Sequence, residues 1–367
     1  MTRRVLVVTG GGDCPGLNAV IRGIVRRASR EKDWEVIGCM ESFNGLLKHD
    51  SIDIISLTER TVSGIHVKGG TILKTINRGG PFEFPVRQDD GSWITEDRSE
   101  LLKKRLENMG IEAVINIGGD GSQRISLALS DMGINVVGVP KTIDNDLSST
   151  DFTFGFQTAV QIATEALDKL VTTAESHNRI FIMEVMGRDA GWIALHSAIA
   201  GGADVCLIPE IPYNPEKVAE KIRTRYTDDE GFCNIVIAEG AMALDRKVTG
   251  ITSSEAGNPH IKLGGVGDKL KRELIEAGIE HDIRVTVLGH LQRGGTPLAY
   301  DRILATEFGV KAFEMVKKKE YRKMVVYRHP KILSVSLEEA IEKPNLINPA
   351  NNWLIHTAKG IGMSLGD

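Results

Sequence analysis

Short apolar segments alternate along this chain with longer segments of helical periodicity, and this alternation restricts the fold more than any other feature. The strand candidates are residues 5–8, 36–39, 113–117, 136–139, 180–185, 205–208, 235–238 and 285–288. They are rich in Val, Ile and Leu without strict polar alternation, which is typical of strands covered on both faces in parallel sheets. The pattern predicts an α/β fold, and 367 residues accommodate two such sheets.

The intervening segments predict amphipathic helices. The clearest helix spans 17–28, where Leu17, Val20, Ile21 and Ile24 recur at helical spacing. Further candidates are residues 123–132, 157–173, 190–200, 215–226, 266–277 and 300–317. Helices that follow strands in this way are typical of βα units. Residues 77–98 are polar and lack periodicity, so we expect an exposed excursion there.

Charge and composition exclude several classes of partner. Lys and Arg number 45 and Asp and Glu 49, which gives a net charge of −4. Such a chain lacks the basic surface that nucleic acids or anionic membranes require, so neither is expected as a partner. Hydrophobic residues make up 41% and charged residues 26%, values typical of a globular protein.

Cysteine usage and the absence of long apolar runs predict a location. The four cysteines, Cys14, Cys39, Cys206 and Cys233, form no pair with zinc-ligand spacing. The apolar run at 5–8 is shorter than the apolar region of a signal peptide, about 7–15 residues. No run approaches the ~18 apolar residues of a membrane span. We therefore expect a soluble, cytoplasmic protein in a reducing compartment.

Two glycine-rich loops follow strand candidates and precede helix candidates. The first is residues 9–16, TGGGDCPG, and the second is residues 118–122, GGDGS. Backbone amides in a turn without side chains can approach a phosphate at a helix N-terminus. The first loop matches neither a P-loop nor the G-x-G-x-x-G pattern, and a tight connection without a ligand also explains it. Asp120 could hold a hydrated Mg²⁺, although Asp is also common in turns.

A third loop, residues 140–146 with the sequence PKTIDND, follows the strand candidate 136–139. Thr142, Asp144 and Asp146 are two residues apart, so an extended segment would point them toward one site. A carboxylate there could accept the proton of an attacking hydroxyl, and another could serve a metal. The alternative is ordinary turn chemistry.

Cationic residues gather near other strand ends. Arg188, His290 and Arg293 follow strand candidates, where open α/β sheets bind ligands, and they suit phosphoryl groups. Arg179 and Arg284 lie at strand beginnings. For any one of these residues, a surface salt bridge is an alternative explanation.

Taken together, these motifs resemble the phosphofructokinase A family of 6-phosphofructokinases, including its pyrophosphate-dependent branch. The resemblance covers residues 5–308 and rests on eight motifs in family order. They are GGGDCPGLNAVIRG, GGTIL, IGGDGS, PKTIDND, FGFQTA, the stretch from SHNR to EVMGR, IAEG and VLGHLQRGG.

The resemblance implies two Rossmann-like three-layer α/β/α domains with largely parallel sheets and an active site in the cleft between them. Residues 1–155 with about 292–342 would bind the phosphoryl donor. Residues 156–291 with about 343–367 would bind the sugar phosphate. The implied reaction is Mg²⁺-dependent phosphorylation of fructose 6-phosphate at its 1-hydroxyl, in a homodimer or homotetramer with shared active sites.

The resemblance also implies roles for individual residues. Asp144 would be the base, with Thr142 beside it, Gly11 would contact the transferred phosphoryl group and Arg188 would neutralise its charge. Donor contacts would be Gly11, Arg78, Gly119, Asp120, Gly121, Ser122 and Lys141, with Asp120 also the Mg²⁺ partner. Sugar-phosphate contacts would be Thr142, Asp144, Asp146, Met186, Gly187, Arg188, Glu239, His290 and Arg293, and Arg179 and Arg284 would reach a neighbouring subunit's substrate. Arg22 and Arg26 resemble effector-site arginines, although a solvated helix face also explains them.

Two positions distinguish the phosphoryl donors, and they disagree. Gly121 fits the ATP-dependent branch, because an Asp there would repel the nucleotide's α-phosphate, whereas Lys141 fits the pyrophosphate branch. Steric and electrostatic exclusion is harder to circumvent than an added cation, so ATP is favoured and pyrophosphate is the alternative. Activity on sedoheptulose 7-phosphate stays open.

Two other classes fit less well. An NAD-dependent dehydrogenase could use Glu41 for the ribose but leaves the PKTIDND and VLGHLQRGG motifs without a role. A non-catalytic nucleotide sensor would be expected to lack Asp144 or Arg188, and both are present.

Overall fold

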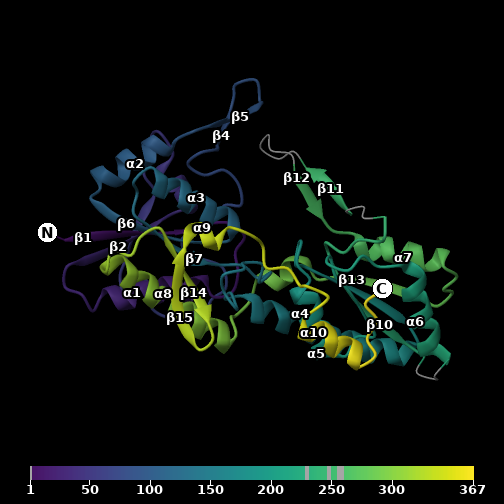
Figure 1. Cartoon of the computed structure of the whole chain (residues 1–367). Helices are drawn as coiled ribbons and strands as arrows, with labels where there is room; N and C mark the ends of the chain where they lie inside the picture. Colours follow the sequence, from purple (N-terminus) through teal and green to yellow (C-terminus); the bar gives the residue numbers. More distant parts are fainter. Residues whose placement is uncertain (1, 228–230, 246–248, 254–259) are drawn as a thin grey trace. The chain divides into compact units, whose positions relative to one another are not determined.

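The computed structural model describes residues 2–227, 231–245, 249–253 and 260–367, and the chain divides into two compact units (Figure 1). Unit 1 comprises Met1–Ile143, Leu147–Gln157 and Arg293–Pro344. Unit 2 comprises Asp144–Asp146, Thr158–Gln292 and Asn345–Asp367. The short segment Asp144–Asp146 therefore groups with unit 2, although it lies within the first of the two domains expected from the sequence.

Unit 1 is built on a seven-stranded sheet in the order β15-β14-β7-β6-β1-β2-β3. Its strands are β1 (Arg3–Thr9), β2 (Trp34–Cys39), β3 (Ile54–Leu57), β6 (Ile111–Gly118), β7 (Val136–Pro140), β14 (Lys323–Arg328) and β15 (Lys331–Ser336). The five central strands are parallel, and the edge strands β3 and β15 are antiparallel to their neighbours. Because β1, β6 and β7 are adjacent and parallel, the loops that follow them lie at one edge of the sheet.

Helices cover both faces of this sheet. Leu6 and Val8 of β1 share an apolar cluster with residues of α2 (Ser99–Asn108) and α3 (Asp120–Asp131). Val5 and Val7 point to the opposite face, as successive residues of a strand do, and are also fully buried. The helices α1 (Leu17–Ala28) and α8 (Ala299–Lys317) lie on that face (Figure 1). Shorter elements of unit 1 are η1 (Ser42–Leu46), η2 (Ile65–Val67) and α9 (Leu337–Ala340).

The α1 and α8 helices cross at two glycines. A β-carbon on Gly309 would lie 2.3 Å from the backbone oxygen of Val20, and one on Gly23 would lie 2.7 Å from that of Thr306. Only the absence of both side chains permits this approach of the two backbones.

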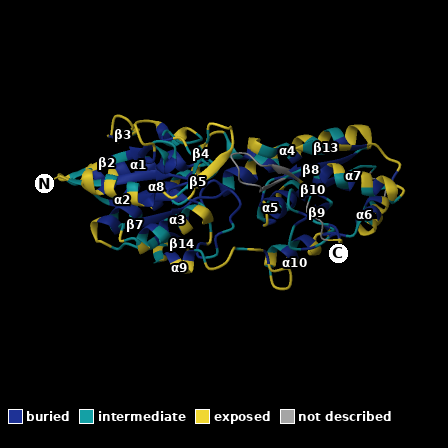
Figure 2. Cartoon of the chain, turned by 90° about the horizontal axis from the view of Figure 1, so that it is seen from above, coloured by how far each residue is buried: buried dark blue, intermediate teal, exposed yellow. Residues whose placement is uncertain are grey.

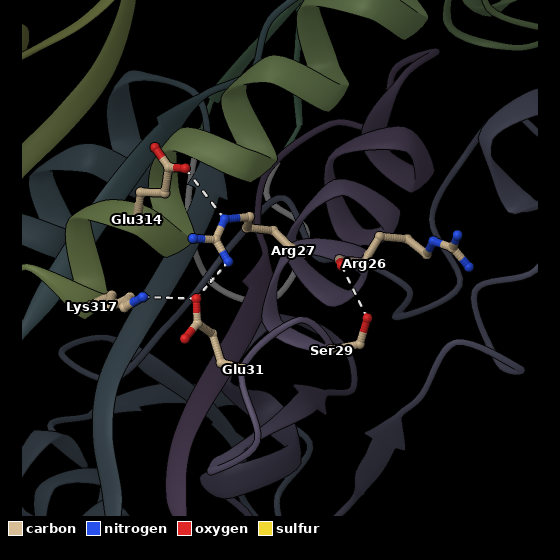
Figure 3. A network of polar contacts seen from close by, with 6 residues as sticks. All are labelled: Arg26, Arg27, Ser29, Glu31, Glu314 and Lys317. Carbon is tan, nitrogen blue, oxygen red and sulfur yellow. Dashed lines mark hydrogen bonds and ion pairs between the residues drawn. The ribbon is translucent and has the colours of Figure 1, made fainter.

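Ion pairs join the two helices at the other end of the α1–α8 interface. Arg27 donates to Glu31 at 2.8 Å and to Glu314 at 3.3 Å, and Lys317 donates to Glu31 at 2.7 Å (Figure 3). Such partly exposed ion pairs stabilise by only about 1 kcal/mol or less, so the buried apolar residues of α1 contribute more to the stability of this interface.

Unit 2 contains a four-stranded, entirely parallel sheet in the order β13-β8-β10-β9. The strands are β8 (Ile180–Val185), β9 (Val205–Leu207), β10 (Cys233–Ala238) and β13 (Ile283–Val287). Around them are α4 (Phe156–His177), α5 (Trp192–Gly201), α6 (Pro215–Thr227), α7 (Val266–Glu276), α10 (Trp353–Gly360), η4 (Gly289–Arg293) and the hairpin β11 (Gly250–Ser253) and β12 (His260–Leu263).

Burial follows this arrangement in both units. Ile180 and Ile182 of β8 pack in one apolar cluster with α6 and α7. Phe181 and Met183 point to the other face and are buried as well. Figure 2 shows that the central strands are almost wholly buried, whereas the helices around them have one exposed side. These three-layer units confirm the predicted α/β fold with largely parallel sheets.

All eight predicted strands and all seven predicted helices are confirmed. Residues 77–98 are largely exposed, as expected, and they contain a hairpin that was not predicted, formed by β4 (Phe84–Arg87) and β5 (Trp93–Glu96). The edge strands β3 and β15 and the inner strand β14, which lies between β7 and β15, were not predicted. They lack the continuous apolar character of the central strands.

The four cysteines are all buried and free. Among the helices of the described ranges, we find none that combines the length and the apolar character of a membrane span.

The α1–α8 crossing yields a stability prediction. Replacing Gly309 with Ala should lower the free energy of unfolding by about 1–3 kcal/mol, because the new β-carbon collides with backbone rather than with a movable side chain. Thermal and denaturant unfolding measure the effect.

Gly360→Ala is the matched control, since a β-carbon on this glycine of α10 meets no atom within 4 Å. It should leave stability unchanged or raise it by up to about 1 kcal/mol. Equal stability of the Gly309→Ala variant and the unmodified protein would contradict the close crossing.

Candidate active site

The two glycine loops of unit 1 pack directly on one another at the carboxyl ends of β1 and β6. The Gly10 amide donates to the carbonyl of Ile117 at 2.9 Å. A β-carbon on Gly10 would lie 2.8 Å from Ser122 Oγ, and one on Gly118 would lie 2.2 Å from the same atom. A side chain on Gly10 would therefore push the two loops apart, and one on Gly118 would collide with Ser122 of its own loop and lie 3.2 Å from the Gly10 carbonyl oxygen.

The backbone amide and the backbone carbonyl of Gly11 both form hydrogen bonds. Its φ of 79° lies in the left-handed region that favours glycine. Its amide donates to Ile76 at 2.9 Å, and its carbonyl accepts from Thr75 Oγ1 at 2.6 Å. Both backbone groups are engaged inside unit 1, so the amide expected to face the phosphoryl group would have to give up the bond to Ile76. The same segment, 75–78, carries the half-buried Arg78.

Two cations flank the first loop. Lys141 is 4% exposed, and its Nζ donates to the Gly12 carbonyl at 2.5 Å. Arg293 Nη1 donates to the Asp13 carbonyl at 3.3 Å and would lie 2.8 Å from a β-carbon on Gly12. Arg293, which is expected among the sugar-phosphate contacts, lies against the first glycine loop, in unit 1. Two positively charged side chains thus lie against the glycines of the first loop.

Asp120 begins α3, directly after Gly119, at the positive end of the helix dipole. Its carboxylate is 47% exposed and pairs with Arg124 at 2.9 Å. Gly121 faces open space, because a β-carbon there meets no atom within 4 Å. Within the described ranges, no three His, Cys, Asp or Glu side chains gather as a metal site. One accessible carboxylate fits Mg²⁺, which is held through one or two carboxylates together with substrate phosphates.

The acidic loop after β7 is buried but not extended. Thr142 is 8% exposed and Asp144 is 9% exposed. Asn145 has a φ of 53°, so the regular alternation expected from Thr142 to Asp146 is wrong. The turn at Asn145 redirects the chain between the two aspartates, and Asp144–Asp146 group with unit 2.

In unit 2, three loops meet at the carboxyl ends of β8, β10 and β13. The Met186 amide donates to the side-chain oxygen of Gln292 at 2.8 Å. The Arg188 amide donates to Glu239 Oε1 at 3.2 Å. The structure therefore brings Met186, Gly187, Arg188 and Glu239 together, beside η4, which carries the exposed His290.

The backbone at Arg188 is strained, and its side chain is accessible. Its φ is 52°, in a region that non-glycine residues rarely adopt. The guanidinium is 75% exposed and lies 3.5 Å from the carboxylate of Asp189. Strained residues of this kind cluster at functional sites.

Arg179 and Arg284 lie at the amino ends of the strands of this sheet, opposite the carboxyl ends. Arg179 donates to Asp282 at 2.8 Å, and Arg284 donates to the same carboxylate at 3.0 Å. Both arginines precede or open parallel strands, so they are separated from Arg188, which follows one. Within one chain they do not join the other predicted sugar-phosphate residues.

The predicted effector arginines lie on α1. Arg26 pairs with Glu59 at 3.1 Å and points away from the Arg27 network (Figure 3). Arg22 is half-buried, and its charge helps to lower the pKa of His66, after burial of the imidazole.

Burial shifts the pKa of two further groups. Removal from water raises the pKa of the Cys14 thiol, in the first loop, to about 12, so this thiol is not a nucleophile at neutral pH. Removal from water also raises the pKa of Glu210, although this carboxylate accepts from the amides of Gly191 and Ile347 at 3.0 Å each.

Three supporting residues were missed by the sequence analysis. Gln292 holds Met186, Thr75 holds Gly11, and Asn345 binds the acidic loop. Gln292 lies inside the motif VLGHLQRGG, which could have drawn attention to it. Asn345 is 200 residues from its partner Asn145, and no sequence pattern connects the two.

The chain is similar to proteins of one known family. The family model described as phosphofructokinase matches residues 4–316. The chain is 46% identical to ATP-dependent 6-phosphofructokinase 2 of Clostridium perfringens over 100% of this chain and 99% of that protein. It is 45% identical to a pyrophosphate–fructose 6-phosphate 1-phosphotransferase of Streptomyces coelicolor over 95% and 97% of the two chains.

Solved structures extend the comparison. Phosphofructokinase from Saccharomyces cerevisiae superposes with a TM-score of 0.76 at 31% identity over 93% of this chain. The match spans 45% of the yeast chain, which is therefore more than twice as long as the matched part. A pyrophosphate-dependent phosphofructokinase from Marinobacter aquaeolei, 24% identical, shares the fold with a TM-score of 0.78 over 99% of this chain and 88% of that one. On these grounds the chain belongs to the phosphofructokinase family.

Proposed function

We propose that this protein is an ATP-dependent 6-phosphofructokinase, which transfers the γ-phosphoryl group of ATP to the 1-hydroxyl of fructose 6-phosphate. The product is fructose 1,6-bisphosphate, an intermediate of glycolysis. The observation that carries the proposal is the packing of two glycine loops on neighbouring strands, with the cations Lys141 and Arg293 beside them and an acidic loop on the next strand. The names of relatives matched over the whole chain support the same reaction.

The chemistry requires a base and stabilisation of negative charge. Asp144 is proposed to accept the proton of the attacking hydroxyl, and Arg188 to offset the charge that develops on the transferred group. Phosphoryl transfer depends on positioning and electrostatics rather than on covalent catalysis, which suits a site without a reactive thiol. Met186, Glu239 and His290 are proposed to bind the sugar phosphate.

Mg²⁺ is the proposed metal, and Asp120 is the residue that would hold it. When bound, the ion neutralises donor phosphate charge. The dipole of α3 and the exposed carboxylate of Asp120 act at the same end of the helix.

Gly121 supports ATP as the donor, and Lys141 does not oppose it. The open space beside Gly121 can admit the larger donor. The Lys141 ammonium is buried and bonded to the Gly12 carbonyl, so part of its role is to hold the loop. Pyrophosphate is the second candidate, favoured by the presence of that lysine and by the name of the Streptomyces relative.

The donor assignment predicts a large preference for ATP. With Mg²⁺ and fructose 6-phosphate, kcat/KM for ATP should exceed that for pyrophosphate by at least about 10²-fold. Gly121→Asp should lower kcat/KM for ATP by about 10²-fold or more, because the added carboxylate meets the nucleotide phosphates. Initial rates with each donor provide the measurement.

Gly121→Ala is the matched control, since its β-carbon enters open space and should leave the ATP kinetics nearly unchanged. An Asp in the first turn of α3 also favours the helix, so loss of folding would not explain the loss of ATP use. A preference of the unmodified enzyme for pyrophosphate would overturn the ATP assignment.

The role of Asp144 predicts a separation of rate from affinity. Asp144→Asn should lower kcat by about 10²–10⁴-fold and leave KM for fructose 6-phosphate within about threefold. Steady-state kinetics measure both, with Asp131→Asn, at the end of α3, as a control that keeps kcat. A near-normal kcat in Asp144→Asn would eliminate this residue as the base.

The subunit arrangement is a further part of the proposal. Arg179 and Arg284 lie at the sheet edge opposite Arg188, and we propose that they serve the sugar phosphate of a neighbouring subunit in a homodimer or homotetramer. The free, buried cysteines suit a cytoplasmic location.

Shared sites predict complementation between inactive variants. Arg284→Ala and Asp144→Asn should each be nearly inactive, yet refolding the two together should restore activity, because a mixed oligomer contains sites with both groups intact. Activity assays before and after joint refolding measure this. Two results would contradict shared sites. One is an active enzyme that light scattering shows to be a monomer, and the other is a refolded mixture that recovers no activity.

A further inference from the structure

We propose that Asn345 is a positioning residue for the acidic loop, and that it holds Asp144 in place relative to the loop that carries Arg188. This inference rests on the proposed function of Asp144 as the base. Asn345 lies in a segment of unit 2 without helix or strand, far in sequence from both loops.

Three hydrogen bonds of Asn345 join the two loops. Its backbone amide donates to the carbonyl of Asp146 at 2.8 Å. Its side-chain amide donates to the carbonyl of Asn145 at 2.9 Å. Its backbone carbonyl accepts from Trp192 Nε1 at 2.7 Å. One residue therefore binds the acidic loop on one side and the beginning of α5 on the other.

The side-chain bond compensates for an unfavourable backbone. Asn145 is 3% exposed and has a φ of 53°, which turns its carbonyl out of the direction that an extended chain would give. Asparagine tolerates this conformation better than most residues, but the conformation still costs free energy and persists only when neighbours hold it. The amide of Asn345 is such a neighbour.

A second contact two residues later reinforces the link. The Ile347 amide donates to Glu210, whose carboxylate also accepts from Gly191, the residue that precedes α5. The 187–192 loop is thus held at its end by the 345–347 segment. Glu239 holds it at Arg188. The 345–347 segment thus supports both the loop that carries the proposed base, Asp144, and the loop that carries the proposed catalytic cation, Arg188.

The kinetic test compares Asn345→Ala with Asn345→Asp. The first removes the donor and leaves space, and the second keeps the size but places a carboxylate against the Asn145 carbonyl. Both should lower kcat by about tenfold to 10²-fold, since small misplacements of reacting groups cost that much, while KM for fructose 6-phosphate stays within about twofold. Full rescue by Asn345→Asp would mean that volume alone matters and would overturn the proposal.

Asn352→Ala is the matched control in the same segment. Asn352 caps α10 by accepting from the amides of Leu354 and Ile355, so its loss should lower the melting temperature and leave kcat unchanged. An equal loss of kcat in Asn352→Ala and Asn345→Ala would indicate a general structural effect and reject the positioning role.

A further variant covers the case in which an Asn345 variant does not fold. Trp192→Phe removes the indole donor to the Asn345 carbonyl, keeps an aromatic ring, and should lower kcat in the same way. Where Asn345→Ala folds, the double variant should show non-additive effects. Unchanged kcat, or additive effects, would count against the link.

Hydrogen–deuterium exchange separates this proposal from the proposed function. Asn345→Ala should speed exchange in the peptide 143–147 by about tenfold and leave α10 unaffected. Unchanged exchange would overturn the positioning role even in an active enzyme. If the unmodified protein phosphorylates no sugar phosphate with either donor, the proposed function fails, and the exchange result still decides whether Asn345 holds the loop.

Discussion

Close packing between the glycine loops after β1 and β6 is the constraint on which the rest of the proposed binding site for the phosphoryl donor depends. The Gly10 amide donates to the Ile117 carbonyl, and Ser122 of the second loop leaves no room for a β-carbon on Gly10. Since the two strands are adjacent and parallel, the loops emerge at the same sheet edge. Lys141 and Arg293 then approach the first loop through its carbonyl oxygens, which places positive charge around a turn that can admit phosphates.

Strain at two positions marks the proposed chemistry. Asn145 and Arg188 are non-glycine residues with φ values of 53° and 52°, and each follows a buried strand closely. Such conformations persist only where the surroundings determine them strongly. Here the surroundings are specific: Glu239 binds the Arg188 amide, and Asn345 binds the Asn145 carbonyl. These hydrogen bonds thus stabilise unfavourable backbone conformations in the two loops that the proposed reaction uses.

Hydrophobic patterning predicted the central strands because a strand buried on both faces must be apolar at every position. The same reasoning could not find β14 or β15, since β15 alternates and lies at an edge. It also described 77–98 as an excursion, because a two-stranded hairpin with exposed Trp93 has no apolar periodicity. For the site, the motifs placed Gly11, Asp120 and Asp144 in loops after strands. They did not reveal that the Gly11 amide is bonded to Ile76 or that Arg293 lies against the first loop.

The sequence by itself determined the class of fold, the family and the loops that carry the chemistry, because these depend on residue type and on spacing along a short segment. Tertiary structure alone decided which distant residues support those loops. Asn345 reaches Asn145 across 200 residues, and Gln292 reaches Met186 across 106. The physical reason is that a hydrogen bond between backbone and side chain needs only proximity and direction, and the folded chain creates both without leaving a periodic trace in the sequence.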